Sequence, residues 1–180
     1  MHDQAEWAVT DLLVRLYALE DKAPDIAALA ERGIVIRRAV APERRVAVNW
    51  VAQQFGEGWA GEVEAAFSRT PTSCHIAVGG QALLGFACFD ATALGFFGPT
   101  GVAPSARGQG IGAALLWASL TAMHAAGYAY AIIGGVGPVD FYARVAGAIP
   151  IPDSTPGLYG GLLRSPARPR SDDPSREPSA

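Results

Sequence analysis

A glycine-rich segment, Arg107 to Gly112 with the sequence RGQGIG, leads directly into the longest helical pattern of the chain. Residues 108–127 repeat apolar side chains at helical spacing and end at a glycine, which predicts a long central helix. One broad face of that helix would carry Ile111, Leu115, Leu116, Leu120 and Met123. The first turn of a helix has unpaired amides and a partial positive charge, and glycines let a ligand approach the backbone. This junction therefore predicts a site for an anion such as phosphate.

Length and composition fit one globular domain. The chain has 180 residues, enough to bury a core without disulfides or structural metals. Half of the residues are hydrophobic, 17% are charged and the formal net charge is -3, so no basic surface for nucleic acid is expected. Cys74 and Cys88 lie in apolar surroundings without metal-ligand spacing and are expected to be buried. We therefore expect neither a metal nor a nucleic-acid partner.

The two ends of the chain differ from its middle. The first residues contain early acids and no basic start before an apolar run, which argues against a signal peptide. Since no apolar stretch is long enough to span a bilayer, we expect no membrane partner and a cytoplasmic protein. Residues 164–180 are rich in proline and charge, which predicts a disordered tail. Residues 1–32 are expected to form an extension that packs on a domain of residues 33–163.

Hydrophobic periodicity divides the domain into strands and helices. The apolar run 12–19 fits either type of element. Strands are predicted at 33–40, 74–80, 82–91, 93–102, 128–136, 148–151 and 157–163. The nearly all-apolar strand 128–136 is expected to be buried on both faces. Helices are predicted at 25–33, 41–55, 58–68, 108–127 and 138–147. Front helices, a meander of strands and a final strand-helix-strand crossover indicate an α+β fold, an α/β sandwich, in place of a Rossmann alternation.

Three kinds of phosphate-binding loop compete for the glycine-rich segment. A Walker loop needs a lysine followed by serine or threonine at its end, where this chain has Ala113 and Ala114. The dinucleotide fingerprint is matched by Gly108, Gly110 and Ala113, but it expects an acidic residue about 20 positions later. Residues 113–139 contain no aspartate or glutamate. These observations exclude the first loop and disfavour the second.

The third kind of loop has the motif [RQ]-x-x-G-x-[GA], which Arg107, Gly110 and Gly112 match. A second segment, DFYARVAGA at 140–148, resembles the FYeklGF segment that follows the fifth strand of the GNAT acyltransferase superfamily, which also carries the loop motif. The resemblance covers residues 33–163. It implies the GNAT fold, a mixed and mostly antiparallel sheet with splayed central strands and helices on both faces. It also implies acetyl-CoA as the co-substrate, bound in the gap between those strands.

The resemblance assigns roles to residues of this chain. The backbone of 97–102, including Gly101 and Val102, would pair with the pantetheine arm and polarise the thioester carbonyl. The pyrophosphate would bind the amides of Arg107, Gly108, Gln109, Gly110, Ile111, Gly112 and Ala113. Tyr142 matches the family's tyrosine, which protonates the departing thiolate as general acid. In the alternative, Tyr142 is a core residue whose hydroxyl reaches the surface.

Two departures from the family pattern concern catalysis and cofactor binding. Many members carry an acidic residue near the fourth strand as general base, but residues 93–102 contain no titratable side chain. Asp90 is the first candidate for that base, followed by Asp140 and Asp153, and each also fits a turn or cap position. Gly135 stands where an asparagine is often found, so cofactor binding is expected to depend more on backbone groups.

The acceptor site of this family is formed by the two front helices and the last two strands. Those segments here contain Trp50, Phe55, Trp59, Glu62, Asp153, Ser154 and Tyr159. Tryptophan faces beside carboxylates and hydroxyls suit a sugar ring with an amine, although aromatics at helical positions also pack inward. The runs at 95–112 and 127–142 and the turn DSTPGLY resemble a bacterial subgroup that includes glucosamine and glucosaminide N-acetyltransferases.

We therefore predict an acetyl-CoA-dependent N-acetyltransferase that acts on the amine of a small molecule, such as the amino sugar glucosamine. The residues predicted to bind the acceptor are Trp59, Asp153, Ser154 and Tyr159. The alternatives are an N-acetyltransferase for a peptide or another amine, and a non-catalytic acyl-CoA sensor. Dimerisation is common in the superfamily, so a homodimer is a further expectation.

Overall fold

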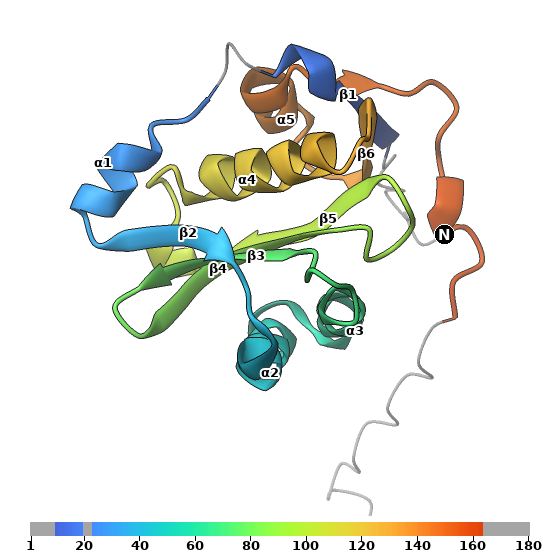
Figure 1. The fold of residues 1–180 in the computed structure, drawn as a ribbon. Helices are drawn as coiled ribbons and strands as arrows, with labels where there is room; N and C mark the ends of the chain where they lie inside the picture. The colour runs from blue at the N-terminus through green and yellow to red at the C-terminus, as the bar shows by residue number, and fades with distance from the viewer. Residues whose placement is uncertain (1–9, 20–22, 164–180) are drawn as a thin grey trace, which may run out of the picture.

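The computed structural model describes residues 10–19 and 23–163, which form a seven-stranded sheet covered by helices (Figure 1). The strands are β1 (Thr10–Arg15), β2 (Ile34–Arg38), β3 (Cys74–Gly79), β4 (Ala82–Phe89), β5 (Phe96–Val102), β6 (Tyr130–Val136) and β7 (Ile149–Pro150). Their order in the sheet is β2-β3-β4-β5-β6-β1-β7, and all neighbours are antiparallel except β5 and β6. The predicted tail at 164–180 lies outside the described residues.

The two central strands β5 and β6 are splayed. They are paired at only two positions, Phe96 with Ile132 and Phe97 with Ile133. On its other side, β5 continues to pair with β4 as far as Val102, which lies opposite Gly85. The long helix connects β5 to β6, because parallel neighbours need a crossover. This arrangement confirms the predicted splay of the central strands.

Helices cover both faces of the sheet (Figure 1). One face carries α1 (Ile26–Glu31), α4 (Ile111–Ala125) and α5 (Val139–Ala146), and the other carries α2 (Arg44–Phe55) and α3 (Glu57–Phe67). Each layer has its own apolar core, since Leu115 and Leu120 belong to one buried cluster and Val51 and Val63 to the other. The predicted α/β sandwich and its long central helix are therefore confirmed.

β6 is buried on one face only. Ala131 and Ile133 are 0% and 2% exposed, whereas Tyr130 is 48% exposed and Gly134 is half-buried. The prediction that both faces are buried is therefore wrong. Beyond Ile133 the edge of β6 has no partner in β5, and residues 133–136 line the gap between the two strands.

Two segments near the ends take a structure that the sequence left open or predicted wrongly. The run 12–19 forms the end of β1 and one 3-10 turn, Leu16–Ala18. β1 pairs with β6 and so contributes a strand to the sheet, whereas the sequence prediction treated residues 1–32 as an extension packed on the domain. The predicted strand at 157–163 is wrong, because Gly157 and Gly161 have φ of 54° and 81° and the chain forms a 3-10 turn at Gly157–Tyr159.

A buried polar pair joins β3 to α4. His75 is 6% exposed and Ser119 is fully buried, and the His75 Nδ1 lies 3.1 Å from the Ser119 Oγ. The His75 ring also stacks on Phe89, with 6.1 Å between the ring centroids. Burial, followed by the positive charge of Arg38, lowers the pKa of His75 to about 4. The imidazole is therefore neutral in the folded protein at neutral pH.

The cysteines are core residues, as predicted. Cys74 and Cys88 are both fully buried and lie opposite each other on β3 and β4 as free thiols. In the part of the chain that the structure describes, no group of three or more His, Cys, Asp or Glu side chains could hold a metal ion. Within the same residues, no helix is long and apolar enough to cross a membrane.

Candidate active site

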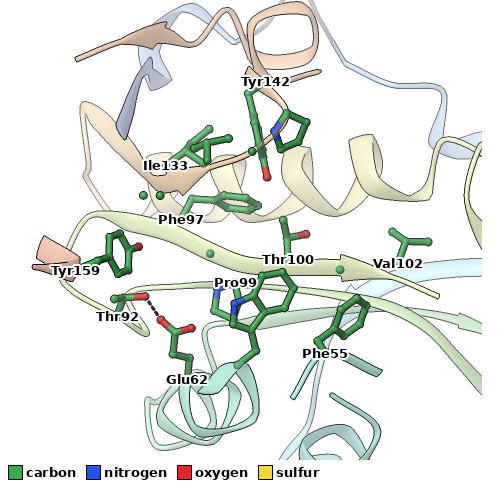
Figure 2. Close-up of a pocket in the computed structure, with 18 of the residues that line it drawn as sticks. Phe55, Glu62, Thr92, Phe97, Pro99, Thr100, Val102, Ile133, Tyr142 and Tyr159 are labelled. Carbon is green, nitrogen blue, oxygen red and sulfur yellow. Dashed lines mark hydrogen bonds between the residues drawn. The ribbon is translucent and has the colours of Figure 1, made fainter. Parts of the chain in front are cut away.

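A cavity of about 790 Å³ opens where β5 and β6 separate (Figure 2). Its walls come from both strands, from α3 and α5 and from the segment 155–159. The predicted site residues that line it are Trp59, Gly101, Val102, Arg107, Tyr142 and Tyr159. This volume is within the usual range of small-molecule sites. The splay thus creates a ligand-sized pocket in the middle of the sheet.

Tyr142 extends from α5 into this pocket, with its hydroxyl directed toward β5 (Figure 2). The side chain is 7% exposed, and its ring makes edge contacts with Phe97 and Phe141 at centroid distances of 6.4 and 5.0 Å. Burial raises the pKa of Tyr142 to about 12. The phenol therefore keeps its proton at neutral pH, and a protonated hydroxyl in the pocket is what a general acid requires.

The glycine-rich loop has the backbone conformation of an anion site. Gly108 and Gly110 have φ of 74° and 84°, and a Cβ at either position would meet no atom within 4 Å. These glycines therefore serve the left-handed backbone and leave open space beside it. α4 begins at Ile111 with no side-chain cap and no acidic residue in its first turn. The amides of that turn are thus available to a phosphate.

Arg107 ties this loop to the end of β5. Its Nε donates a hydrogen bond to the Val102 carbonyl at 3.2 Å, and both residues line the pocket. The remaining loop residues, 108–113, follow at the start of α4 and are not among the residues that line the cavity. The pocket is therefore continuous with the entry of the loop, and the loop itself would hold a part of the ligand that extends beyond the cavity.

Arg32 also contacts this loop, although the sequence analysis did not identify it. It follows α1 directly and donates hydrogen bonds to the Gln109 carbonyl, at 3.4 Å, and to the Gln109 side-chain oxygen. The guanidinium adds a positive charge next to the predicted phosphate site. No local sequence signal marks this contact, because the two residues are 77 positions apart.

The opposite side of the pocket is acidic and aromatic. Glu62 of α3 lines it and accepts a hydrogen bond from the Thr92 hydroxyl (Figure 2). Tyr159 lies nearby, and its pKa is raised by burial first and then by the negative charges of Glu62 and Asp11. Trp59 is 39% exposed and stacks on Phe55, with 5.3 Å between the ring centroids. These side chains can bind an apolar ring face and a cation.

The sequence left open whether the aromatic residues of the front helices line the acceptor site or pack in the core, and the structure shows both cases. Trp50 is not among the pocket-lining residues and packs against Phe55 and Phe86 in the core, at centroid distances of 5.7 and 6.3 Å. Phe55 itself lies over β5, because a Cβ on Gly101 would come within 2.5 Å of its ring. A side chain at position 101 would collide with the Phe55 ring, so glycine at this position allows the ring to pack on the strand.

Asp90 lies outside the pocket lining and is fully engaged elsewhere. Its carboxylate accepts hydrogen bonds from the Gly95 amide at 2.7 Å and the Tyr128 hydroxyl at 3.0 Å. It also forms an ion pair with Arg69 at 3.2 Å. Asp90 has a φ of 52° and is 9% exposed, as fits a turn residue that orders the β4–β5 connection. These contacts do not support its prediction as general base.

Asp153 and Ser154 also lie outside the pocket lining. The Ser154 hydroxyl donates to the Ile151 carbonyl and accepts from the Asp11 amide, at 2.8 and 2.9 Å, so it holds a turn together. Asp11, which the sequence analysis did not identify, accepts a hydrogen bond from the Gly135 amide at 2.9 Å. Ser154 and Asp11 thus order the segment next to Gly135, whereas Asp153 is exposed with a φ of 57°. The predicted contacts of Asp153 and Ser154 with an acceptor are not supported. Asp140, the remaining base candidate, is exposed and does not line the pocket either.

Three solved structures share this fold at low sequence identity. A GCN5-related glucosamine N-acetyltransferase region of a fungal multi-domain GH3 beta-N-acetylglucosaminidase matches with a TM-score of 0.65 and 17% identity, over 79% of this chain and 20% of that one. A Drosophila protein matches with a TM-score of 0.61 and 16% identity, over 79% and 47% of the two chains. A GCN5-related N-acetyltransferase from Sphaerobacter thermophilus matches with 0.53 and 20%, over 79% and 48%. The chain thus spans between 20% and 48% of the length of these structures.

The sequence comparison extends over most of the sheet. No curated protein matches the chain significantly. The model of the Acetyltransferase (GNAT) family matches residues 38–147, which is more than half of the chain. That range contains the glycine-rich loop, the splayed strands and Tyr142. The chain therefore belongs to the Acetyltransferase (GNAT) family.

Proposed function

We propose that this enzyme transfers an acetyl group from acetyl-CoA to the amine of a small molecule, with an amino sugar such as glucosamine as the acceptor. One observation carries the proposal, namely that the pocket at the splay is bordered by residues from both helical layers. Tyr142 reaches it from one layer, and Trp59 and Glu62 reach it from the other. An acyl donor and an amine acceptor can therefore enter the gap from different sides and meet inside it.

The residues on the donor side fit acetyl-CoA, which supplies a thioester as the acyl donor. The loop amides near Gly110 suit the pyrophosphate, since they are uncapped and flanked by open space. The backbone edge of β5 beyond Phe97 has no strand partner on the β6 side, so it can pair with an extended arm. Tyr142 holds the proton that a departing thiolate needs.

The acceptor side favours an amine on a ring. Trp59 offers a half-exposed aromatic face, on which the apolar face of a sugar can stack. Glu62 offers a negative charge to an ammonium group, and the hydroxyl groups of Thr92 and Tyr159 offer hydrogen bonds to a sugar. The structural neighbour described as a glucosamine N-acetyltransferase region supports the same class of acceptor.

An acceptor panel tests the proposal. The protein is incubated with acetyl-CoA and, in turn, with glucosamine, chitosan oligomers, polyamines and peptides, while release of free CoA is followed. We expect turnover with the amino sugars, and mass spectrometry of the product should show one acetyl group on nitrogen. Turnover of a peptide amine without turnover of any sugar would contradict the acceptor assignment and leave the acetyltransferase assignment in place.

Arg32→Ala is expected to weaken CoA binding by about threefold to fivefold, because an exposed charge pair contributes less than about 1 kcal/mol. The loss should shrink at high salt, since exposed charges are screened. Isothermal titration calorimetry with CoA and with 3′-dephospho-CoA measures it and shows which phosphate the guanidinium serves. Arg45→Ala, an exposed arginine on α2, is the matched control. Equal losses in the two variants would contradict a local contact.

A further inference from the structure

The enzyme needs a group that takes a proton from the acceptor amine, and β5 provides none. Among the described residues that line the pocket, Glu62 is the only carboxylic acid. It is half-buried on α3, and its side chain points from that helix toward the gap (Figure 2). The position of this carboxylate therefore decides where an ammonium group can bind.

Glu62 and Tyr142 approach the gap from opposite faces of the sheet. Glu62 belongs to α3, below β5 in the view of Figure 2, whereas Tyr142 belongs to α5, above it. Both side chains line the same cavity. The group that accepts a proton from the attacking amine and the group that gives a proton to the leaving sulfur act on different atoms of the tetrahedral intermediate, so two groups that reach the cavity from different sides can serve both. The two residues are placed in this way.

The surroundings of Glu62 leave its charge for a ligand. The Thr92 hydroxyl donates to its Oε1, which orients the carboxylate and leaves Oε2 for another partner. The titratable groups that face it are Tyr159 and the buried thiol of Cys88, whose pKa values are both raised, and neither is a cation. No ion pair within the described part of the chain involves Glu62. The cation that lines the same cavity, Arg107, is bonded to the Val102 carbonyl.

We propose that Glu62 binds the ammonium group of the acceptor and removes its proton, with Thr92 as the residue that positions the carboxylate. This inference rests on the proposed function. Glu62 takes one proton from the ammonium and passes it to water. The freed nitrogen lone pair then forms a bond to the acetyl carbonyl carbon, and the carbon–sulfur bond breaks. Tyr142 protonates the sulfur and is reprotonated from water, while Glu62 takes the second proton from the acylated nitrogen and passes it to water, so the net products are amide, thiol and one proton.

Glu62→Gln tests this role, because it keeps the size of the side chain and its ability to accept the Thr92 hydrogen bond. We expect kcat/KM for the amine to fall by about 10²- to 10⁴-fold, as for loss of a general base. The loss should be largest at low pH and should shrink toward the pKa of the amine, since the variant depends on amine that is already deprotonated in solution. Thr92→Val should lower kcat/KM less than Glu62→Gln, and Thr92→Ser should restore it.

Glu64→Gln is the matched control, since it makes the same change two residues away on α3. Glu64 is exposed and pairs with Arg44 on the far side of the helix from the pocket, so its variant should keep the wild-type rate. Calorimetry gives a readout that needs no turnover. With CoA present, Glu62→Gln should bind the amine at least about tenfold more weakly, as expected for loss of a charge-assisted contact, and should bind CoA unchanged.

The outcomes separate this inference from the function on which it rests. If the wild-type enzyme acetylates an amine and Glu62→Gln keeps both its kcat/KM and its pH profile, the role of Glu62 is overturned while the function stands. If kcat/KM falls equally at every pH, Glu62 binds the amine without taking its proton, and the base role is overturned. If the wild-type enzyme acetylates no amine, the proposed function itself is overturned.

Discussion

Replacement of Tyr142 by phenylalanine is expected to lower kcat by about 10²- to 10⁴-fold, which is the usual contribution of a general acid. The ring should keep its contacts with Phe97 and Phe141, because only the hydroxyl is removed and that hydroxyl points into the pocket. The melting temperature and the affinity for CoA should therefore stay near those of the wild-type enzyme. Steady-state release of CoA, together with calorimetry for CoA binding, measures the two effects separately.

The pH dependence of kcat is a second test of the role of Tyr142. Because burial raises the pKa of Tyr142 to about 12, ionisation of this phenol should not reduce kcat of the wild-type enzyme near pH 10, where a free tyrosine already ionises. Tyr128→Phe is a control, since Tyr128 bonds Asp90 at the turn outside the pocket lining. If the Tyr142→Phe enzyme releases CoA at the wild-type rate, Tyr142 is not the general acid.

Folding stability is expected to fall by about 3 kcal/mol between pH 6.5 and pH 4 on account of His75 alone. The pKa of this histidine is depressed from 6.5 to about 4 by burial and by Arg38. Between pH 6.5 and pH 4 the unfolded chain binds a proton at this histidine that the folded protein does not bind. The stability that depends on a neutral His75 is therefore fully present above pH 6.5 and is lost as the pH falls through 4. Urea unfolding at several pH values measures the slope.

His75→Gln should flatten this slope even if it lowers stability at neutral pH, because the variant has no titrating imidazole at this position. His124→Gln, at an exposed position near the end of α4, is the matched control and should leave the slope in place. Glu43 acts at lower pH, since its hydrogen bond with Arg37 lowers its pKa from 4.5 to about 2. An unchanged slope in His75→Gln would show that other groups cause the acid transition.

Much of the fold was predictable because its patterns are local. The helix at 108–127 and the meander of β3, β4 and β5 follow from apolar spacing and from turns, and both were predicted at nearly their observed positions. The terminal segments were not, because their structure depends on distant partners. β1 becomes a strand through pairing with β6, and the short, mostly apolar run 12–19 does not reveal that contact in the sequence.

The site shows the same division. The glycine-rich loop before α4 and the place of Tyr142 on α5 were predictable, since their motifs are short and continuous in sequence. The position of Asp90 outside the pocket was not predictable, because a carboxylate next to a strand has the same sequence pattern whether it faces a cavity or caps a turn. Asp90 and Ser154 are bound to backbone and turn partners, whereas Glu62 shares the cavity with Tyr142 only through the packing of α3 on the sheet.

The separation of β5 from β6 also gives the sheet two interior edges. An open strand edge normally invites pairing with another polypeptide, and proteins shorten or charge such edges to prevent it. The outer edges here follow this rule, since β7 has two residues and β2 carries Arg37 and Arg38. The interior edges lie between two helical layers. Their unpaired backbone groups face a cavity, so the fold offers a hydrogen-bonding surface to ligands thin enough to enter it, and this surface is less exposed than an outer strand edge.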